Sequence, residues 1–144
     1  MAENLVPPTD EFIESIAKKY GMTYTKGKKG EDRFYADDGR PIYPPNNGAV
    51  GKEEKVILPK GTVISRYGGN AGKYASPEGT VMEARALSKQ TREQKDLHTF
   101  VLEKDIECLQ SEVAPWFGQE GRGVQYRLQS TIESMLKRGE LSEK

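Results

Sequence analysis

The chain has 144 residues, the usual size of a single domain, and its 22 lysines and arginines equal its 22 aspartates and glutamates. A formal net charge of zero lacks the basic excess of nucleic-acid-binding proteins, so nucleic acid is not expected as a partner. One cysteine and one histidine form no internal disulfide and argue against a zinc site, and no apolar run is long enough to insert into a membrane.

The first predicted element is an amphipathic helix that begins after Thr9. Asp10 suits the positive end of the helix dipole, apolar residues recur at helical spacing as far as Tyr20, and Gly21 is the expected stop. The sequence before this helix lacks the basic and then apolar run of a signal peptide. Export is therefore expected to depend on a larger parent polypeptide or a specialised secretion machine.

Residues 22–55 are predicted to form turns, because Pro41, Pro44 and Pro45 exclude a long helix and Asn46-Asn47-Gly48 is a strong turn signal. Short apolar runs then predict strands. Their expected positions are 56–58, 63–65, 81–87, 98–102, 106–109 and 124–128.

The last predicted element is a helix with Ser130 as its cap and Glu133 completing a capping box. Ile132 and Met135 belong to its apolar stripe, and Gly139 ends it. The elements together predict an α+β fold: a small, twisted antiparallel sheet with a helix near each terminus.

Polar side chains in or beside apolar strand sequence are the candidates for chemistry. They are Arg66, Arg85, His98 and Gln125. A buried polar group without a partner costs about 1–3 kcal/mol, so protein, solvent or a ligand must supply one. Taken singly, each has a simpler interpretation: an arginine at a strand end usually lies on the surface or in an ion pair, and a lone histidine is usually structural. Composition and spacing by themselves leave the function open.

The order of five motifs is more specific than any one motif. They are PNNG at 45–48, LPKGTVISRYG at 58–68, GKYASPEG at 72–79, ARAL at 84–87, and APWFGQ at 114–119 running into GVQY at 123–126. This ordered set resembles the tuberculosis necrotizing toxin family of NAD glycohydrolase domains over residues 40 to 141. The resemblance implies that residues 1–40 are an N-terminal flanking segment with one helix and that residues 41–144 form the toxin domain.

The resemblance also implies an active site. Its positions correspond to Arg66, Tyr74, Arg85, His98 and Gln125 in this chain.

The chain departs from the family pattern at three positions near these motifs. Ser65 stands where an aspartate commonly precedes the arginine, Ser88 replaces a proline, and Arg122 interrupts a run that is often all glycine. The implied active-site side chains are all present, so the departures concern substrate detail more than activity.

These residue types suit cleavage of NAD. The planar forks of Arg66 and Arg85 can bind pyrophosphate oxygens, with Gly68 letting the backbone approach. Gln125 can bond the carboxamide or a ribose hydroxyl, and Tyr74 can pack against the ring or bond the ribose.

His98 could orient or deprotonate the attacking water. The catalytic set is therefore expected to be Gln125, His98, Arg66 and Arg85. Glu78 and Glu83 are reserve candidates for stabilising the ribose cation.

The expected function is that of an NAD glycohydrolase toxin, which splits NAD (or NADP) into nicotinamide and ADP-ribose and needs no metal or cofactor. Such a bacterial effector would be made in the cytoplasm, exported, and active in the cytoplasm of a target cell, with a dedicated immunity protein blocking its site. Two alternatives stay open: an ADP-ribosyltransferase toxin, and an inactive NAD-binding or interaction module.

Overall fold

The computed structural model describes residues 8–144. The expectation that no signal peptide begins the chain concerns residues 1–4, which lie outside the described part. Within residues 8–144, no helix is long and apolar enough to cross a membrane.

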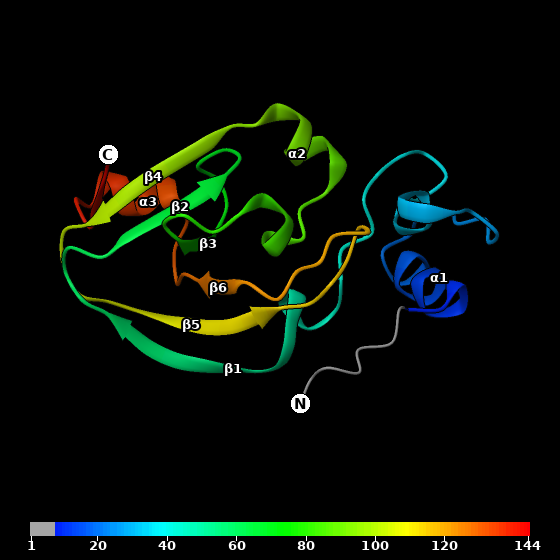
Figure 1. The fold of residues 1–144 in the computed structure, drawn as a ribbon, viewed down its shortest axis with the longest axis horizontal. Helices are drawn as coiled ribbons and strands as arrows, with labels where there is room; N and C mark the ends of the chain where they lie inside the picture. The colour runs from blue at the N-terminus through cyan, green and yellow to red at the C-terminus, as the bar shows by residue number, and fades with distance from the viewer. Residues whose placement is uncertain (1–7) are drawn as a thin grey trace.

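One twisted antiparallel sheet dominates the described residues, and its strands lie in the order β1-β5-β6-β3-β2-β4-β7. The β1–β5–β6 half and the β2–β4 half run at a clear angle to each other, as Figure 1 shows. The strands are β1 (Ala49–Leu58), β2 (Val63–Tyr67), β3 (Tyr74–Pro77), β4 (Leu97–Leu102), β5 (Ile106–Val113), β6 (Val124–Arg127) and β7 (Leu141–Glu143). The predicted α+β class is confirmed.

Three α-helices accompany the sheet in residues 8–144: α1 (Asp10–Lys19), α2 (Lys89–Gln94) and α3 (Ile132–Lys137). Helix α1 is capped as expected, because the Thr9 hydroxyl accepts a hydrogen bond from the Phe12 amide at 3.1 Å. Helix α3 begins one residue later than predicted. Its cap is Thr131, which accepts from the Ser134 amide, so the expected capping box at Ser130 is wrong.

Two apolar clusters form the interior. The larger one packs α3 against the sheet, with Phe100, Ile64 and Ile132 fully buried. The second packs α1 and the segment after it against Trp116 and Phe117, and the Trp116 indole donates to the Ile42 carbonyl at 2.7 Å. The second cluster therefore ties the N-terminal part to the 114–119 loop, while the boundary expected at residue 40 stays a prediction.

The strand expected at 81–87 is wrong. Met82–Arg85 is a 3₁₀ helix, and Ala86 after it has left-handed backbone with φ 49°. The carbonyls of Glu83 and Ala84 accept hydrogen bonds from the amides of Gly121 and Gly123, so a loop occupies the place of a neighbouring strand. Arg85, the last residue of this 3₁₀ helix, is buried.

Sequence patterning also missed several elements. Strand β1 starts at Ala49, whereas the sequence predicted a start at residue 56. The prediction missed the first residues because β1 is an edge strand whose first half is mostly exposed and lacks an apolar alternation. The short elements β3, β7 and α2 were not predicted, since each has too few residues for a periodic pattern.

Candidate active site

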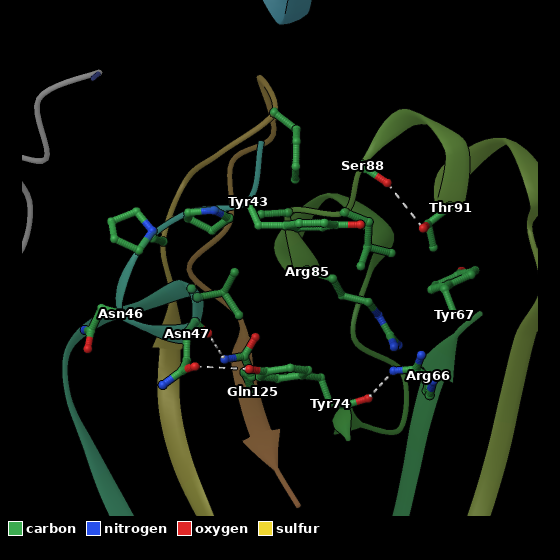
Figure 2. A pocket seen from close by; sticks show the side chains of 18 of the residues that line it. Tyr43, Asn46, Asn47, Arg66, Tyr67, Tyr74, Arg85, Ser88, Thr91 and Gln125 are labelled. Carbon is green, nitrogen blue, oxygen red and sulfur yellow. Dashed lines mark hydrogen bonds between the residues drawn. The ribbon is translucent and has the colours of Figure 1, made fainter. Parts of the chain in front are cut away.

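A cavity of about 660 Å³ opens where the ends of β2, β3 and β6 meet the segment 43–48 and the segment 85–91. The side chains that matter most for its chemistry are Tyr43, Asn47, Arg66, Tyr74, Arg85 and Gln125, all of which line it (Figure 2). Four of the sequence-predicted site residues therefore come together: Arg66, Tyr74, Arg85 and Gln125.

Arg85 is buried, with 8% of its surface exposed, and backbone and hydroxyl oxygens hold its guanidinium. Its Nη2 donates to the Ser65 hydroxyl at 2.7 Å and to the Thr80 carbonyl at 2.8 Å, and its Nη1 donates to the Ser65 carbonyl at 3.2 Å. The Tyr67 ring lies 4.9 Å from the guanidinium carbon. Burial lowers the pKa of Arg85, although an arginine stays charged at neutral pH.

Arg66 comes from β2 and bends around the loop that follows it. Its Nε donates to the Gly69 carbonyl at 2.7 Å, and its Nη1 donates to the Tyr74 carbonyl at 2.9 Å. Gly72 makes room for this side chain, because a Cβ there would lie 2.5 Å from the guanidinium carbon. Burial lowers the pKa of Arg66 as well. The loop thus fixes the guanidinium at the cavity wall.

Neither guanidinium is neutralised by an acidic side chain. Among residues 8–144, no carboxylate oxygen lies within 4.0 Å of the nitrogens of Arg66 or Arg85, and no Asp or Glu lines the cavity. A half-buried or buried cation without a counter-ion is costly. The cavity is therefore suited to a ligand that brings oxyanion groups.

Gln125 lies at the opposite end of the cavity from the arginines, on β6. Its Nε2 donates to the Asn47 carbonyl at 3.0 Å. Because a carbonyl can only accept, the NH₂ end of the amide must face Asn47, and this assignment turns Oε1 toward the cavity. Gln125 can therefore offer a ligand an acceptor, whereas the sequence left donor and acceptor roles both open.

Two tyrosine rings face each other across this end of the cavity, as Figure 2 shows. Tyr74, on β3, donates its hydroxyl to Asn47 Oδ1 at 3.3 Å, and burial raises the pKa of its phenol. Tyr43 is 61% exposed and meets the buried Phe117 ring edge-on at 5.9 Å. Both rings line the cavity, and an aromatic ring can pack against a flat aromatic ligand group.

His98 does not line the cavity. On β4 it pairs with Arg66 in register, but its ring bonds Glu143 at 2.6 Å and Asp96 at 2.8 Å. The hydrogen bond to Glu143, with the nearby Asp96 charge, raises the pKa of His98. A catalytic role for His98 therefore stays a sequence-based prediction without support from this arrangement.

The other sequence candidates also lie outside the lining. Gly68 has φ 110°, and a Cβ there would approach Arg66 Nη2 at 3.6 Å. Glu78 pairs with Lys144 at 3.3 Å, and Glu83 belongs to the 3₁₀ helix. Neither glutamate lines the cavity.

The sequence did not single out Tyr43 or Asn47. Asn47 appeared in the sequence as part of a turn and of the PNNG motif, with no role of its own. Its left-handed backbone, with φ 54°, is typical of an asparagine in a turn. Tyr43 stands between prolines in a segment without periodicity, so no pattern marks it. In the described part of the chain, no group of three or more His, Cys, Asp or Glu is arranged to hold a metal.

Comparison with known proteins shows which family this chain resembles. A family model described as tuberculosis necrotizing toxin matches residues 57–144. The conidial surface nicotinamide adenine dinucleotide glycohydrolase of Aspergillus fumigatus is 30% identical over 74% of this chain. The match covers 50% of that relative, so the chain spans about half its length.

Two solved structures are similar in fold. The structure of tuberculosis necrotizing toxin with its immunity factor gives a TM-score of 0.62 at 22% identity, covering 90% of this chain and 81% of that one. At this identity the likeness shows the fold. The structure of Tse6 in complex with Tsi6 gives a TM-score of 0.46 at 13% identity, covering 96% and 98%. That likeness is too low to support an inference.

Proposed function

This chain belongs to the tuberculosis necrotizing toxin family, and we propose that it hydrolyses the bond between nicotinamide and ribose in NAD. The A. fumigatus relative is named for NAD glycohydrolase activity, which supports the proposed reaction. The observation that carries the proposal is the pair of guanidinium groups, Arg66 and Arg85, that meet at one cavity without a carboxylate partner in residues 8–144.

The arginines would bind the pyrophosphate of the dinucleotide. A pyrophosphate carries two negative charges, and guanidinium forks bind such oxygens in bidentate fashion. Arg66 and Arg85 stand on the same side of the cavity in Figure 2. Each charge-assisted hydrogen bond contributes about 1.5–3 kcal/mol, so two arginines can account for much of the affinity.

The nicotinamide riboside end would then lie toward Gln125. The rings of Tyr43 and Tyr74 could hold the flat base between them. The Gln125 Oε1 could accept a hydrogen bond from a ribose hydroxyl or from the carboxamide, and its partial negative charge would stabilise positive charge that develops on the ribose.

The chemistry suits a site without an acid. The bond from the ribose C1′ to the nicotinamide nitrogen breaks, and its electron pair leaves with nicotinamide, which becomes neutral. The ribose carbon becomes oxocarbenium-like, a water oxygen bonds to it, and the water's proton passes to solvent. The leaving group needs no proton, which agrees with a lining that, among residues 8–144, includes no Asp, Glu or His.

We further propose that the chain acts as a toxin domain, exported to deplete NAD in the cytoplasm of a target cell. A protein that empties NAD would harm its producer, so a dedicated inhibitor is expected to cover the cavity. The structural relative solved with its immunity factor supports this idea for the fold, and the partner of this chain is an inference from it.

Purified protein incubated with NAD tests the reaction directly. The proposal expects free nicotinamide and ADP-ribose in equal amounts, with NADP as a second substrate in parallel. ADP-ribose attached to added protein would instead show a transferase. Dinucleotide binding without turnover would show a binding module. An Arg66→Ala protein provides the matched control for contaminating activity.

A further inference from the structure

A chain of contacts runs from an ion pair beneath the cavity to the two side chains that face the ribose end. Arg127 donates from Nε and Nη2 to the two oxygens of Glu53, each at 2.9 Å. Glu53 Oε1 accepts from Asn47 Nδ2 at 3.4 Å, and these contacts lower the pKa of the Glu53 carboxyl. Asn47 in turn contacts both Tyr74 and Gln125.

The polar atoms of Asn47 bond different partners. Its backbone carbonyl accepts from Gln125 Nε2 at 3.0 Å, and its Oδ1 accepts from the Tyr74 hydroxyl at 3.3 Å. Its Nδ2 faces Glu53. Every polar atom of the side chain has a partner, and in Figure 2 the contacts to Gln125 and Tyr74 lie along one wall of the cavity.

The backbone of Asn47 explains why this residue type is needed. Its φ of 54° and ψ of 25° are left-handed, a conformation that costs most residues about 1–2 kcal/mol but that asparagine and glycine adopt more readily. This conformation directs the carbonyl toward β6 while the side chain points toward β3. An asparagine thus does both tasks at one position.

We propose that Asn47 is the positioning residue of the active site: its carbonyl fixes the orientation of the Gln125 amide, so that Oε1 faces the substrate, and its side chain holds Tyr74. The Glu53–Arg127 pair keeps Asn47 in place. The inference rests on the proposed NAD hydrolysis for its catalytic consequence. Asn47 belongs to the PNNG motif at 45–48, but neither the sequence resemblance nor the family model, which matches residues 57–144, assigns a role to Asn47 or Glu53.

Two substitutions separate the carbonyl from the side chain. Asn47→Gly keeps the left-handed backbone and the carbonyl but removes the contact to Tyr74. Asn47→Ala strains the backbone and should move the carbonyl as well. The Gln125 side-chain amide signals in a ¹⁵N–¹H spectrum, assigned by their loss in Gln125→Ala, report the contact to the carbonyl without any turnover.

We expect Asn47→Ala to shift the Gln125 amide signals. It should also lower kcat about tenfold to a hundredfold with a smaller change in KM, because a displaced Gln125 amide stabilises the transition state less well. Asn47→Gly should shift those signals less and lower kcat less than Asn47→Ala does, because glycine keeps the left-handed carbonyl and loses only the side-chain contacts to Tyr74 and Glu53. Adding Tyr74→Phe to Asn47→Gly should cost less than the sum of the single changes, because both remove one contact.

Asn46→Ala is the matched structural control. Asn46 also has left-handed backbone, with φ 57°, but within residues 8–144 its side chain donates only to the carbonyls of Ala49 and Gly51. Alanine there should strain the turn equally and leave the Gln125 amide signals unmoved. Shifted signals in this control would show a general loss of the turn and overturn the proposal.

Two further results would also overturn it. One is a folded Asn47→Ala protein with unchanged Gln125 signals and unchanged kcat. The other is a fall in kcat with unchanged Gln125 signals, which would mean that Asn47 touches the substrate itself. If the wild-type protein fails to cleave NAD, the proposed function fails alone, because the amide signals still test the positioning role.

Discussion

Arg85 donates hydrogen bonds to both the hydroxyl and the carbonyl of Ser65, at 2.7 and 3.2 Å. Ser65 directly precedes Arg66 in β2, so one strand anchors the first guanidinium and carries the second. The family commonly has an aspartate at position 65, which would put a carboxylate beside Arg85. Serine instead gives that guanidinium a neutral hydroxyl acceptor, so its charge is not paired with a carboxylate there.

Removing either arginine should weaken NAD cleavage. Arg66→Ala is expected to lower kcat/KM by about ten- to a hundredfold, which corresponds to one lost charge-assisted contact, and Arg66→Lys should recover only part of it. Arg85→Lys tests the second site with less damage to the fold than alanine would cause. Arg40→Ala is the control, since Arg40 pairs with Asp38 on the exposed surface. Steady-state kinetics on the folded variants measure the effect. A fully active Arg66→Ala protein would show that Arg66 does not bind the pyrophosphate.

Gly72 offers a way to move Arg66 without changing it. In Gly72→Ala the new Cβ would lie 2.5 Å from the Arg66 guanidinium carbon and 2.6 Å from Nη1, so the side chain must shift. We expect KM for NAD to rise several-fold with little change in melting temperature. Gly69→Ala is the matched control, because nothing lies within 4 Å of a Cβ there. Equal KM values for the two variants would show that the position of Arg66 is unimportant.

Two buried serines should respond in opposite ways to alanine. Ser65→Ala leaves a buried Arg85 donor without its hydroxyl acceptor, and we expect a loss of about 1–3 kcal/mol in the free energy of unfolding. In residues 8–144 the Ser111 hydroxyl is buried and has no hydrogen-bond partner, so Ser111→Ala should be neutral or stabilising. Denaturant titration measures both. Equal losses would mean that the Ser65–Arg85 contact adds nothing to stability.

His98 distinguishes the sequence-based hypothesis from the observed geometry. As a general base, His98 would give the wild-type enzyme a fall in activity at acid pH, and His98→Asn would lower kcat. None of the described residues that line the cavity is a His, Asp or Glu, so we expect a flat kcat/KM profile from about pH 5.5 to 8.5 and an unchanged kcat in His98→Asn. A lower kcat in the fully folded variant would restore His98 to the catalytic set.

The same variant should reveal a pH-dependent effect on stability. The pairing with Glu143 raises the pKa of His98, so its stabilisation is fully present below the unfolded value near 6.5 and is lost as pH rises through the folded pKa. Both carboxylate partners are about half exposed to solvent, which screens the ion pairs, so the effect should be about 1 kcal/mol or less. Unfolding of wild type and His98→Asn at pH 5.5 and 8 measures it.

Much of the sheet could be predicted because short apolar runs mark parts of β1, β2, β4, β5 and β6. Arg66, Tyr74, Arg85 and Gln125 were found through motif order, and the structure brings them to one cavity. The 3₁₀ helix that ends at Arg85 could not be found, since the partners of its carbonyls lie in a loop almost 40 residues further along the chain, which no local pattern reveals.

The part of the site before β1 was hidden for a related reason. Asn47 and Tyr43 act through their placement against β3, β6 and Phe117, and their own segment has no periodic pattern. A turn-rich sequence predicts where the chain bends, but it does not predict which strands the bent segment will contact. Only the folded chain shows that this bend closes the cavity.

Tyr43 gives the last prediction. Its exposed ring faces Tyr74 across the cavity, so we expect it to cover one face of the nicotinamide or of the reacting end of the dinucleotide (Figure 2). Tyr43→Ala should raise KM about five- to a hundredfold, since an aromatic–base stack contributes about 1–3 kcal/mol, and Tyr43→Phe should stay near wild type because the face of the ring is kept. Phe12→Ala is the control, an aromatic that is 45% exposed and lines a different cavity. A Tyr43→Phe variant as impaired as Tyr43→Ala would point to the hydroxyl instead, and an unchanged KM in Tyr43→Ala would show that the ring does not contact the substrate.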